Sequence, residues 1–246
     1  IPTLLKYPED RVIIVDPEDE YSDIGRAFGA QMVDISIGSK THINLLDLPD
    51  LDRLDDEDDD PIGDKANLLM GLFESILSEV TDAQIGIIDR VTGVTYERYL
   101  TENFTPTLKE WHQVLKEQPE PEAQDLALAV ETYTTGSQDI FAHNTNVDLN
   151  YRFVIFNLKK LSHKLKPFAL MVIQDYIWNQ IVENQGKCTT WVYFDEMQIL
   201  FKNKAQADFF TTLYSRIRKY GAIPTGITQN VETPVSYTHL RAHETV

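Results

Sequence analysis

Residues 189–196 read Thr-Thr-Trp-Val-Tyr-Phe-Asp-Glu, a run of β-branched and aromatic residues that ends in two adjacent carboxylates. Because the run is apolar on both alternate faces, it predicts a strand that is covered on both sides, as in a parallel sheet. Ligands of such sheets bind in the crevice beyond the carboxyl ends of the strands. We therefore expect Asp195 and Glu196 to point into a binding site. On spacing alone, the alternative that they cap a helix beginning near Met197 stays open.

A second apolar run favours the binding-site interpretation. Residues 222–230 read Ala-Ile-Pro-Thr-Gly-Ile-Thr-Gln-Asn, so the polar Thr228 and Gln229 come at the carboxyl end of a predicted strand. Residues 209–221, between the two runs, have helical spacing, are basic in the last turn and stop at Gly221, as helices commonly do. Strand, helix and strand in this order would bring Gln229 to the same crevice as the two acids.

The string from Trp191 to Glu232 resembles the conjugal-transfer ATPases of type IV secretion systems. It contains Tyr-Phe-Asp-Glu-Met at 193–197 and Arg-Lys-Tyr-Gly-Ala-Ile-Pro-Thr-Gly-Ile-Thr-Gln-Asn-Val at 218–231. These ATPases are the VirB-four or TraC-like members of the HerA–FtsK superfamily. Earlier stretches agree with the family in order: residues 15–21, residues 43–47, Thr135-Gly136-Ser137 leading to Phe141, and residues 145–147.

The resemblance implies an α/β fold, a RecA-like P-loop NTPase core with a mainly parallel sheet and an all-helical insertion. Residues 1–61 would be the first part of the core, residues 62–133 the insertion and residues 134–232 the second part of the core. The periodicity of apolar residues agrees with this division. It predicts strands over 11–16, 31–37 and 152–158, a long core helix over 167–182, and insertion helices over 66–77, 83–99, 108–117 and 122–132.

The same resemblance assigns roles to five residues. Asp195 would be the Walker B acid associated with Mg²⁺, and Glu196 the general base that activates water. Gln229 would sense the γ-phosphate. Arg218, with Arg216 in reserve, would be an arginine finger that reaches the nucleotide of a neighbouring subunit. The alternative for both arginines is compensation of the charge at a helix C-terminus.

An acidic segment, Asp-Pro-Glu-Asp-Glu-Tyr, follows the predicted strand 11–16. In the family this motif lies near the nucleotide, so Asp16 and Glu18, with Thr228 from the last strand, are candidate cofactor-binding residues for ATP and Mg²⁺. The alternative is that an Asp or Ser before Ile24 caps a helix over Ile24–Phe28 that stops at Gly29.

A phosphate-binding loop of the form Gly-x-x-x-x-Gly-Lys-Ser/Thr does not occur in these 246 residues. We expect the chain to begin after its own loop and therefore to bind and hydrolyse ATP poorly by itself. Residues 233–246 depart from the family pattern and look like a translated sequencing adaptor, so we expect this tail to be non-native. For that reason His239 and His243, which are four residues apart, are not predicted to bind a metal.

The implied function is that of an ATP-hydrolysing motor subunit of a conjugation or type IV secretion apparatus, which energises DNA and protein transfer. It would act as a homo-oligomer, expected to be a hexamer, on the cytoplasmic face of the cell membrane. Its partners would be inner-membrane components of the channel and a coupling protein, with DNA bound only indirectly or transiently. One alternative is a DNA-translocating motor of the coupling-protein or HerA–FtsK type. Another is a non-hydrolysing structural or assembly module.

Charge and composition set limits on these functions. The net charge of −17 opposes broad electrostatic adhesion to nucleic acid. Nine of the acids fall within residues 47–60, which predicts a solvated acidic loop. No apolar run approaches the ~18 residues of a membrane span, so membrane contact would be made through partners. The single cysteine, Cys188, excludes an internal disulfide and fits a reducing compartment.

Overall fold

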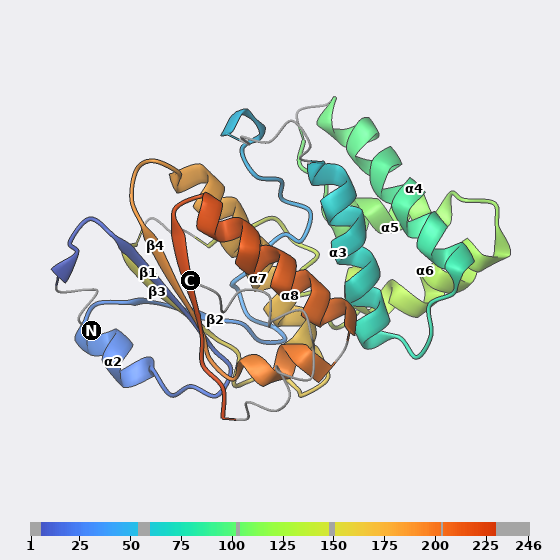
Figure 1. Ribbon diagram of the computed structural model, residues 1–246. Coiled ribbons are helices and arrows are strands. Elements are labelled where there is room, and N and C mark those ends of the chain that lie inside the picture. Colours follow the sequence, from blue (N-terminus) through green and yellow to red (C-terminus); the bar gives the residue numbers. More distant parts are fainter. Residues whose placement is uncertain (1–5, 54–59, 102–103, 148–150, 203, 230–246) are drawn as a thin grey trace. The chain divides into compact units, whose positions relative to one another are not determined.

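The computed structural model of the chain describes residues 6–53, 60–101, 104–147, 151–202 and 204–229 (Figure 1). The predicted non-native tail lies outside the described residues. The chain divides into two compact units, one formed by residues 1–35 together with 148–246 and the other by residues 36–147. In the part of the chain that is described, no helix combines the length and the apolar composition that crossing a membrane requires.

The first unit is built on a sheet of five strands in the order β2-β3-β1-β4-β5, and every neighbouring pair is parallel. The predicted α/β class and mainly parallel sheet are therefore confirmed. The strands are β1 (Arg11–Asp16), β2 (Gln31–Asp34), β3 (Phe153–Asn157), β4 (Thr190–Phe194) and β5 (Ala222–Gly226). The strand predicted over 31–37 ends three residues earlier than expected.

Three helices connect these strands: α2 (Ser22–Ala27), α7 (Leu165–Asn184) and α8 (Lys204–Lys219). The step from β1 to β2 runs one way along the sheet, whereas the steps from β3 to β4 and from β4 to β5 run the other way. Because parallel crossovers are right-handed, α2 must cover one face and α7 and α8 the opposite face, as Figure 1 shows. A short 3₁₀ helix, η2 (Met197–Lys202), precedes α8.

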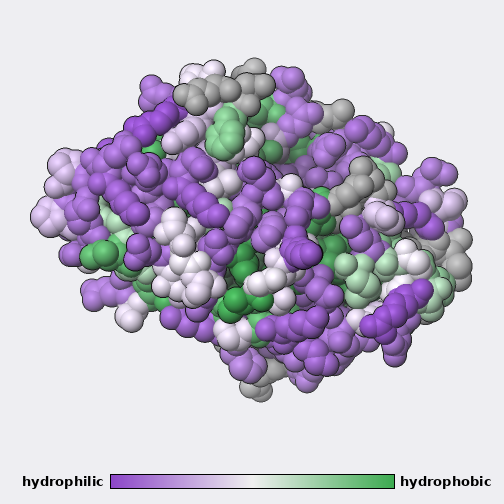
Figure 2. Space-filling view, turned by 180° about the vertical axis from the view of Figure 1, so that it is seen from behind, coloured by the Kyte–Doolittle hydropathy of each residue, from purple (hydrophilic) through white to green (hydrophobic). Residues whose placement is uncertain are grey.

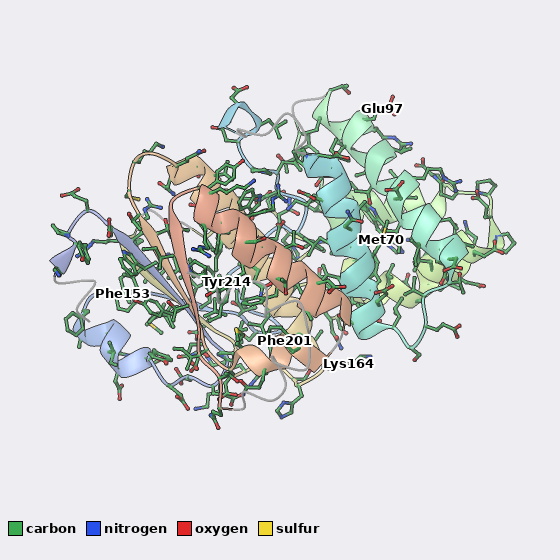
Figure 3. All side chains as sticks on the ribbon, in the orientation of Figure 1. Met70, Glu97, Phe153, Lys164, Phe201 and Tyr214 are labelled. Atoms are coloured by element: carbon green, nitrogen blue, oxygen red, sulfur yellow. The ribbon has the colours of Figure 1, made fainter. Side chains whose placement is uncertain are left out.

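Strand β5 forms one edge of the sheet, and its sequence suits that place. Pro224 cannot donate a backbone hydrogen bond, which is tolerated at an edge strand. Tyr214, labelled in Figure 3, projects from α8, and its hydroxyl donates to the carbonyl oxygen of Pro224 at 3.0 Å. One position of the exposed edge is thus occupied by a side chain from the same unit.

The described residues of the second unit form four helices, and the starts of these helices follow from sequence signals. They are α3 (Pro61–Ile76), α4 (Asp82–Leu100), α5 (Leu108–Lys116) and α6 (Pro121–Thr134), with a short 3₁₀ helix, η1 (Leu51–Arg53), before them. Thr81 and Thr107 each form a capping box with the residue three positions later. The four predicted insertion helices are confirmed, while the insertion bounds of 62–133 stay a prediction.

The loop before these helices and the loop after them are joined by a polar network. The Thr145 hydroxyl accepts from the amide of Asn44 at 2.7 Å and donates to Asp47 Oδ2 at 2.5 Å. Asn44 Nδ2 donates to Asp47 Oδ1 at 3.0 Å. Burial raises the pKa of Asp47, and the bond from Thr145 and the charge of Lys65 partly offset this effect. The expectation of a solvated acidic loop is therefore wrong for Asp47, whose carboxylate joins segments 98 residues apart.

Two histidines that are far apart in the sequence meet beside this network. The rings of His42 and His143 lie 4.3 Å apart, centroid to centroid. His143 Nε2 lies 2.9 Å from Asp139 Oδ2, and its Nδ1 lies 3.4 Å from Lys109 Nζ. Within the described ranges, no three or more histidine, cysteine or acidic residues are grouped so that they would hold a metal ion.

His112 gives the second unit a pH dependence that can be measured. Its side chain is buried on α5, with Nε2 2.9 Å from the Ala127 carbonyl and Nδ1 2.9 Å from the Thr134 hydroxyl. Burial lowers the pKa of His112, so the folded state holds the neutral ring. Unfolding therefore takes up a proton once the pH falls below about 6.5, the ordinary value.

We predict that the free energy of unfolding decreases as the pH falls from 7.5 to 5.5, and that H112Q reduces this decrease because glutamine does not titrate. Urea unfolding at both pH values measures it. H163Q, which alters an exposed histidine, is the matched control and should keep the wild-type pH dependence. An identical pH dependence in H112Q and wild type would contradict the assignment.

Candidate functional site

Three neighbouring strands end at one edge of the first unit and bring their following residues together. The amide of Asp195 donates to the carbonyl of Val15 at 3.0 Å, which ties the end of β4 to β1. The amide of Ile227 donates to the carbonyl of Phe194 at 2.8 Å, which ties the end of β5 to β4. As predicted, the acids after β1 and β4 and the polar residues after β5 lie at the same edge.

Asp16 ends β1 and is fully buried. Its Oδ1 accepts from the amide of Glu20 at 3.0 Å, and its Oδ2 accepts from the amide of Tyr21 at 2.9 Å. The N-cap residue of α2 is Tyr21, which makes no side-chain capping bond. The alternative that these acids cap the helix over Ile24–Phe28 is therefore wrong, because Asp16 instead closes the turn before it.

The other acids of this segment also have defined partners. Glu18 forms an ion pair with Lys166 at 2.5 Å, in which the lysine side chain is 5% exposed and the glutamate 44%. Asp19 has a φ of 66°, in the left-handed region, and its Oδ1 accepts from Asn157 Nδ2 at 2.6 Å. A hydrogen bond from the Ser22 hydroxyl lowers the pKa of Asp19. The sequence did not predict the contribution of Lys166 or Asn157, because neither has a local signal.

Asp195 follows β4 and is only 6% exposed. Its Oδ1 accepts from the amide of Glu196 at 2.9 Å, whereas Oδ2 is buried and has no hydrogen-bond partner among the described residues. Burial raises the pKa of Asp195 most, the hydrogen bond from the Glu196 amide lowers it, and the carboxylate of Asp16 raises it again. The nearby Tyr21 hydroxyl also lowers this pKa, although it forms no hydrogen bond of normal geometry with Oδ2. The pKa of Tyr21 is raised by burial and by Asp195. Two buried acids with one unpartnered oxygen fit a divalent cation, since Mg²⁺ binds through one or two carboxylates and water.

Glu196 lies next to Asp195 with a φ of 51°, a left-handed conformation that is uncommon outside glycine. Its carboxylate accepts from two side-chain amides: Gln229 Nε2 donates to Oε1 and Gln198 Nε2 donates to Oε2. Gln198 Oε1 in turn accepts from the Thr228 hydroxyl at 2.7 Å. The structure thus brings the predicted Glu196, Gln229 and Thr228 together and adds Gln198, which sequence reasoning did not identify.

The two predicted arginines lie away from this group. Helix α8 follows the carboxyl end of β4 and leads to the amino end of β5. Its last turn, which carries both arginines, therefore lies at the amino ends of the strands, away from the acids. The guanidinium of Arg216 lies over the ring of Trp178, 4.7 Å from its centroid. Arg218 is exposed and lines a surface hollow with Tyr214, Ile223 and Pro224. Neither arginine is positioned to act on a ligand at the acids of its own chain.

No protein-family model and no curated protein matches the chain. Among solved structures, VirB4 of Thermoanaerobacter pseudethanolicus is similar with a TM-score of 0.79 and 23% identity, over 97% of this chain and 68% of that one. This chain has the VirB4 fold. The resemblance seen in the sequence is thereby confirmed for the fold, including its RecA-like core.

A second solved structure shares the fold less closely than VirB4 does. The bacterial conjugative coupling protein TrwB, in a trigonal form in complex with sulphate, is similar with a TM-score of 0.56 and 15% identity. The match covers 98% of this chain and 62% of TrwB. The chain thus spans roughly two thirds of the length of each of these two structures.

We predict that D16A destabilises the first unit by about 1–3 kcal/mol, because it removes the charged acceptor of two part-buried backbone amides of the turn, those of Glu20 and Tyr21. Urea unfolding measures the change. D23A is the matched control, since its carboxylate is almost fully exposed and pairs only with Arg26 at the surface. We expect this variant to stay within about 0.5 kcal/mol of wild type. Equal stabilities of the two variants would contradict the role of Asp16 in the turn.

Proposed function

We propose that this chain is part of an ATP-hydrolysing motor subunit of a conjugation or type IV secretion apparatus. The observation that carries the proposal is the pair Asp195 and Glu196 at the end of a central strand, with the Gln229 amide on Glu196, within the VirB4 fold. Phosphoryl transfer to water uses an acid that binds Mg²⁺, a general base and a group that contacts the γ-phosphate, and we assign these roles to Asp195, Glu196 and Gln229.

Asp195 is the residue we assign to Mg²⁺, because its Oδ2 is buried and unpartnered. Mg²⁺ bound there would neutralise charge on the transferring phosphates. Asp16 and Glu18 would frame the site from the β1 side, Asp16 by holding the turn and Glu18 through its pair with Lys166. The phosphate loop would have to come from sequence other than these 246 residues, which contain no such motif.

Glu196 is the residue we assign to the general base. A carboxylate within hydrogen-bond reach of a water can accept its proton as the water attacks the γ-phosphate. Gln229 would hold the γ-phosphate, and Thr228 lies beside it at the same end of β5. These assignments rest on the shared edge and on the contact between Gln229 and Glu196.

Arg218 is the residue we assign to the nucleotide of a neighbouring subunit. The proposal is supported by its exposure, since Arg218 lines a hollow near the start of β5 and is therefore accessible to a neighbouring subunit. An arginine supplied in trans requires a ring or another closed oligomer, and a hexamer is the form we propose.

DNA contact would be indirect or transient. The net charge is −17, and most of the face seen in Figure 2 is hydrophilic. A strongly acidic chain lacks the phosphate-neutralising charge that a DNA-pumping motor uses. This favours the secretion ATPase over the coupling-protein alternative, as does the lower TM-score of TrwB. The proposed location is the cytoplasmic face of the membrane, next to channel components and a coupling protein.

In the full-length protein, we predict that E196Q lowers ATP turnover by about 10²- to 10⁴-fold, the usual contribution of a general base, and leaves ATP binding intact. Steady-state hydrolysis and equilibrium binding of a fluorescent ATP analogue measure the two effects. E183Q, an exposed position on α7, is the control and should hydrolyse ATP at the wild-type rate. Wild-type turnover in E196Q would refute the base assignment. Absence of turnover in the wild type would favour the non-hydrolysing assembly module.

Mixing two inactive variants tests the assignment of Arg218. R218A lacks the residue offered to a neighbour, whereas E196Q lacks the base of its own site. In a mixed ring, a site whose own subunit is R218A still has Glu196, and it receives Arg218 when the neighbouring subunit is E196Q. Equal random mixing gives this combination at about a quarter of the interfaces, so we predict recovery of about a quarter of the wild-type ATPase activity. A mixture of E196Q with D195N should stay inactive, because both changes affect the same subunit's site. Failure of the first mixture to recover activity would contradict action in trans.

A further inference from the structure

The geometry points to Gln198 as a positioning residue that fixes one oxygen of Glu196 and leaves the other for chemistry. This inference rests on the proposed function, in which Glu196 is the base. We reach it from the three side chains that are hydrogen-bonded to the Glu196 carboxylate directly or through one another: Gln198, Gln229 and Thr228.

The first step is the orientation of the Gln198 amide. An ionised carboxylate can only accept hydrogen bonds, so Gln198 must present its NH₂ group to Glu196 Oε2. The carbonyl end of the same amide then faces Thr228, whose hydroxyl donates to Gln198 Oε1 at 2.7 Å. Each end of the Gln198 side chain is thereby matched to one partner, and the amide has a single favourable orientation.

The second step is the backbone that carries these side chains. The amide of Met197 donates to the carbonyl of Ile227 at 2.9 Å, which joins the segment after β4 to the segment after β5. The hydrogen bond from Thr228 to Gln198 joins the same two segments through side chains. One backbone and one side-chain hydrogen bond thus join these two segments and fix the position from which Gln198 donates to Glu196.

The third step is the difference between the two amides on Glu196. Gln198 is partly buried and has its second bond to Thr228. Gln229 is exposed, and the one side-chain bond described for it is the bond to Glu196 Oε1. When Gln229 turns to a phosphate, Oε1 becomes available to a water, while Oε2 stays bound to Gln198. The two carboxylate oxygens thus have separate tasks, one in orientation and one in accepting the proton.

The test uses the full-length protein and the conservative pair T228V and T228S. Loss of the hydroxyl in T228V releases the carbonyl end of Gln198, so we expect kcat to fall by about tenfold with KM unchanged. T228S keeps the hydroxyl and should restore kcat. Q198L should lower kcat by about 10- to 100-fold, within the contribution of the base itself. The double variant Q198L/T228V should be no slower than Q198L, because both changes break one chain of bonds.

Controls separate this inference from the proposed function and from misfolding. Q180L alters a glutamine on α7 outside the site and should keep wild-type kcat. In an E196Q background, Q198L should cause no further loss, since the oriented group is already absent.

If E196Q is inactive while Q198L and T228V keep wild-type kcat, the positioning role is overturned and the base assignment stands. A rise in KM at unchanged kcat in T228V would instead indicate direct nucleotide contact and overturn the inference. Wild-type turnover in E196Q would overturn the proposed function itself.

Discussion

Parallel pairing of β4 with both of its neighbours is the constraint on which the site depends. The carboxyl ends of parallel strands lie on the same side of a sheet. The register of β4 against β1 and β5 therefore determines which residues follow all three strands on that side. Val15 pairs with Phe194, and Phe194 pairs with Gly226, which sets Asp16, Asp195 and the residues after β5 side by side. A shift of β4 by one residue would move Asp195 out of this row and reverse the faces of its apolar side chains. The buried core and the site are therefore specified by the same pairing.

The two buried acids at this edge have different partners, and that difference suggests their roles. Asp16 uses both carboxylate oxygens on backbone amides of the adjoining turn, so its charge is satisfied within the fold. Asp195 uses one oxygen and leaves the other buried without a partner, and its pKa is raised by burial and by Asp16. A cation at Asp195 would offset the repulsion between them. We propose that Asp16 supports the site and that Asp195 is its metal-binding group.

Sequence reasoning succeeded where the signal was local and failed where it depended on tertiary contacts. Apolar runs ending in polar groups located β1, β4 and β5 and the residues beyond them, because strand period and burial are written in adjacent positions. The ion pair of Glu18 with Lys166 spans 148 residues and the bond from Thr145 to Asp47 spans 98, and neither leaves a pattern along the chain. The acidic neighbours of Asp47 indicate a solvated loop, whereas its hydrogen bond with Thr145 holds the carboxylate in a partly buried position. Gln198 had only its closeness to Glu196 as a signal.

We propose that Mg²⁺ and the phosphates of ATP bind beyond the carboxyl ends of β1, β4 and β5 in the full-length protein. Anomalous diffraction from Mn²⁺, which shares the oxygen preference of Mg²⁺, tests it most directly in crystals grown with a non-hydrolysable ATP analogue. We expect one Mn²⁺ peak next to Asp195 Oδ2, about 2 Å away if bound directly or about 4 Å away through a water, with the γ-phosphate beside Glu196 and Gln229. A nucleotide-bound Mn²⁺ at any place remote from Asp195 would contradict it.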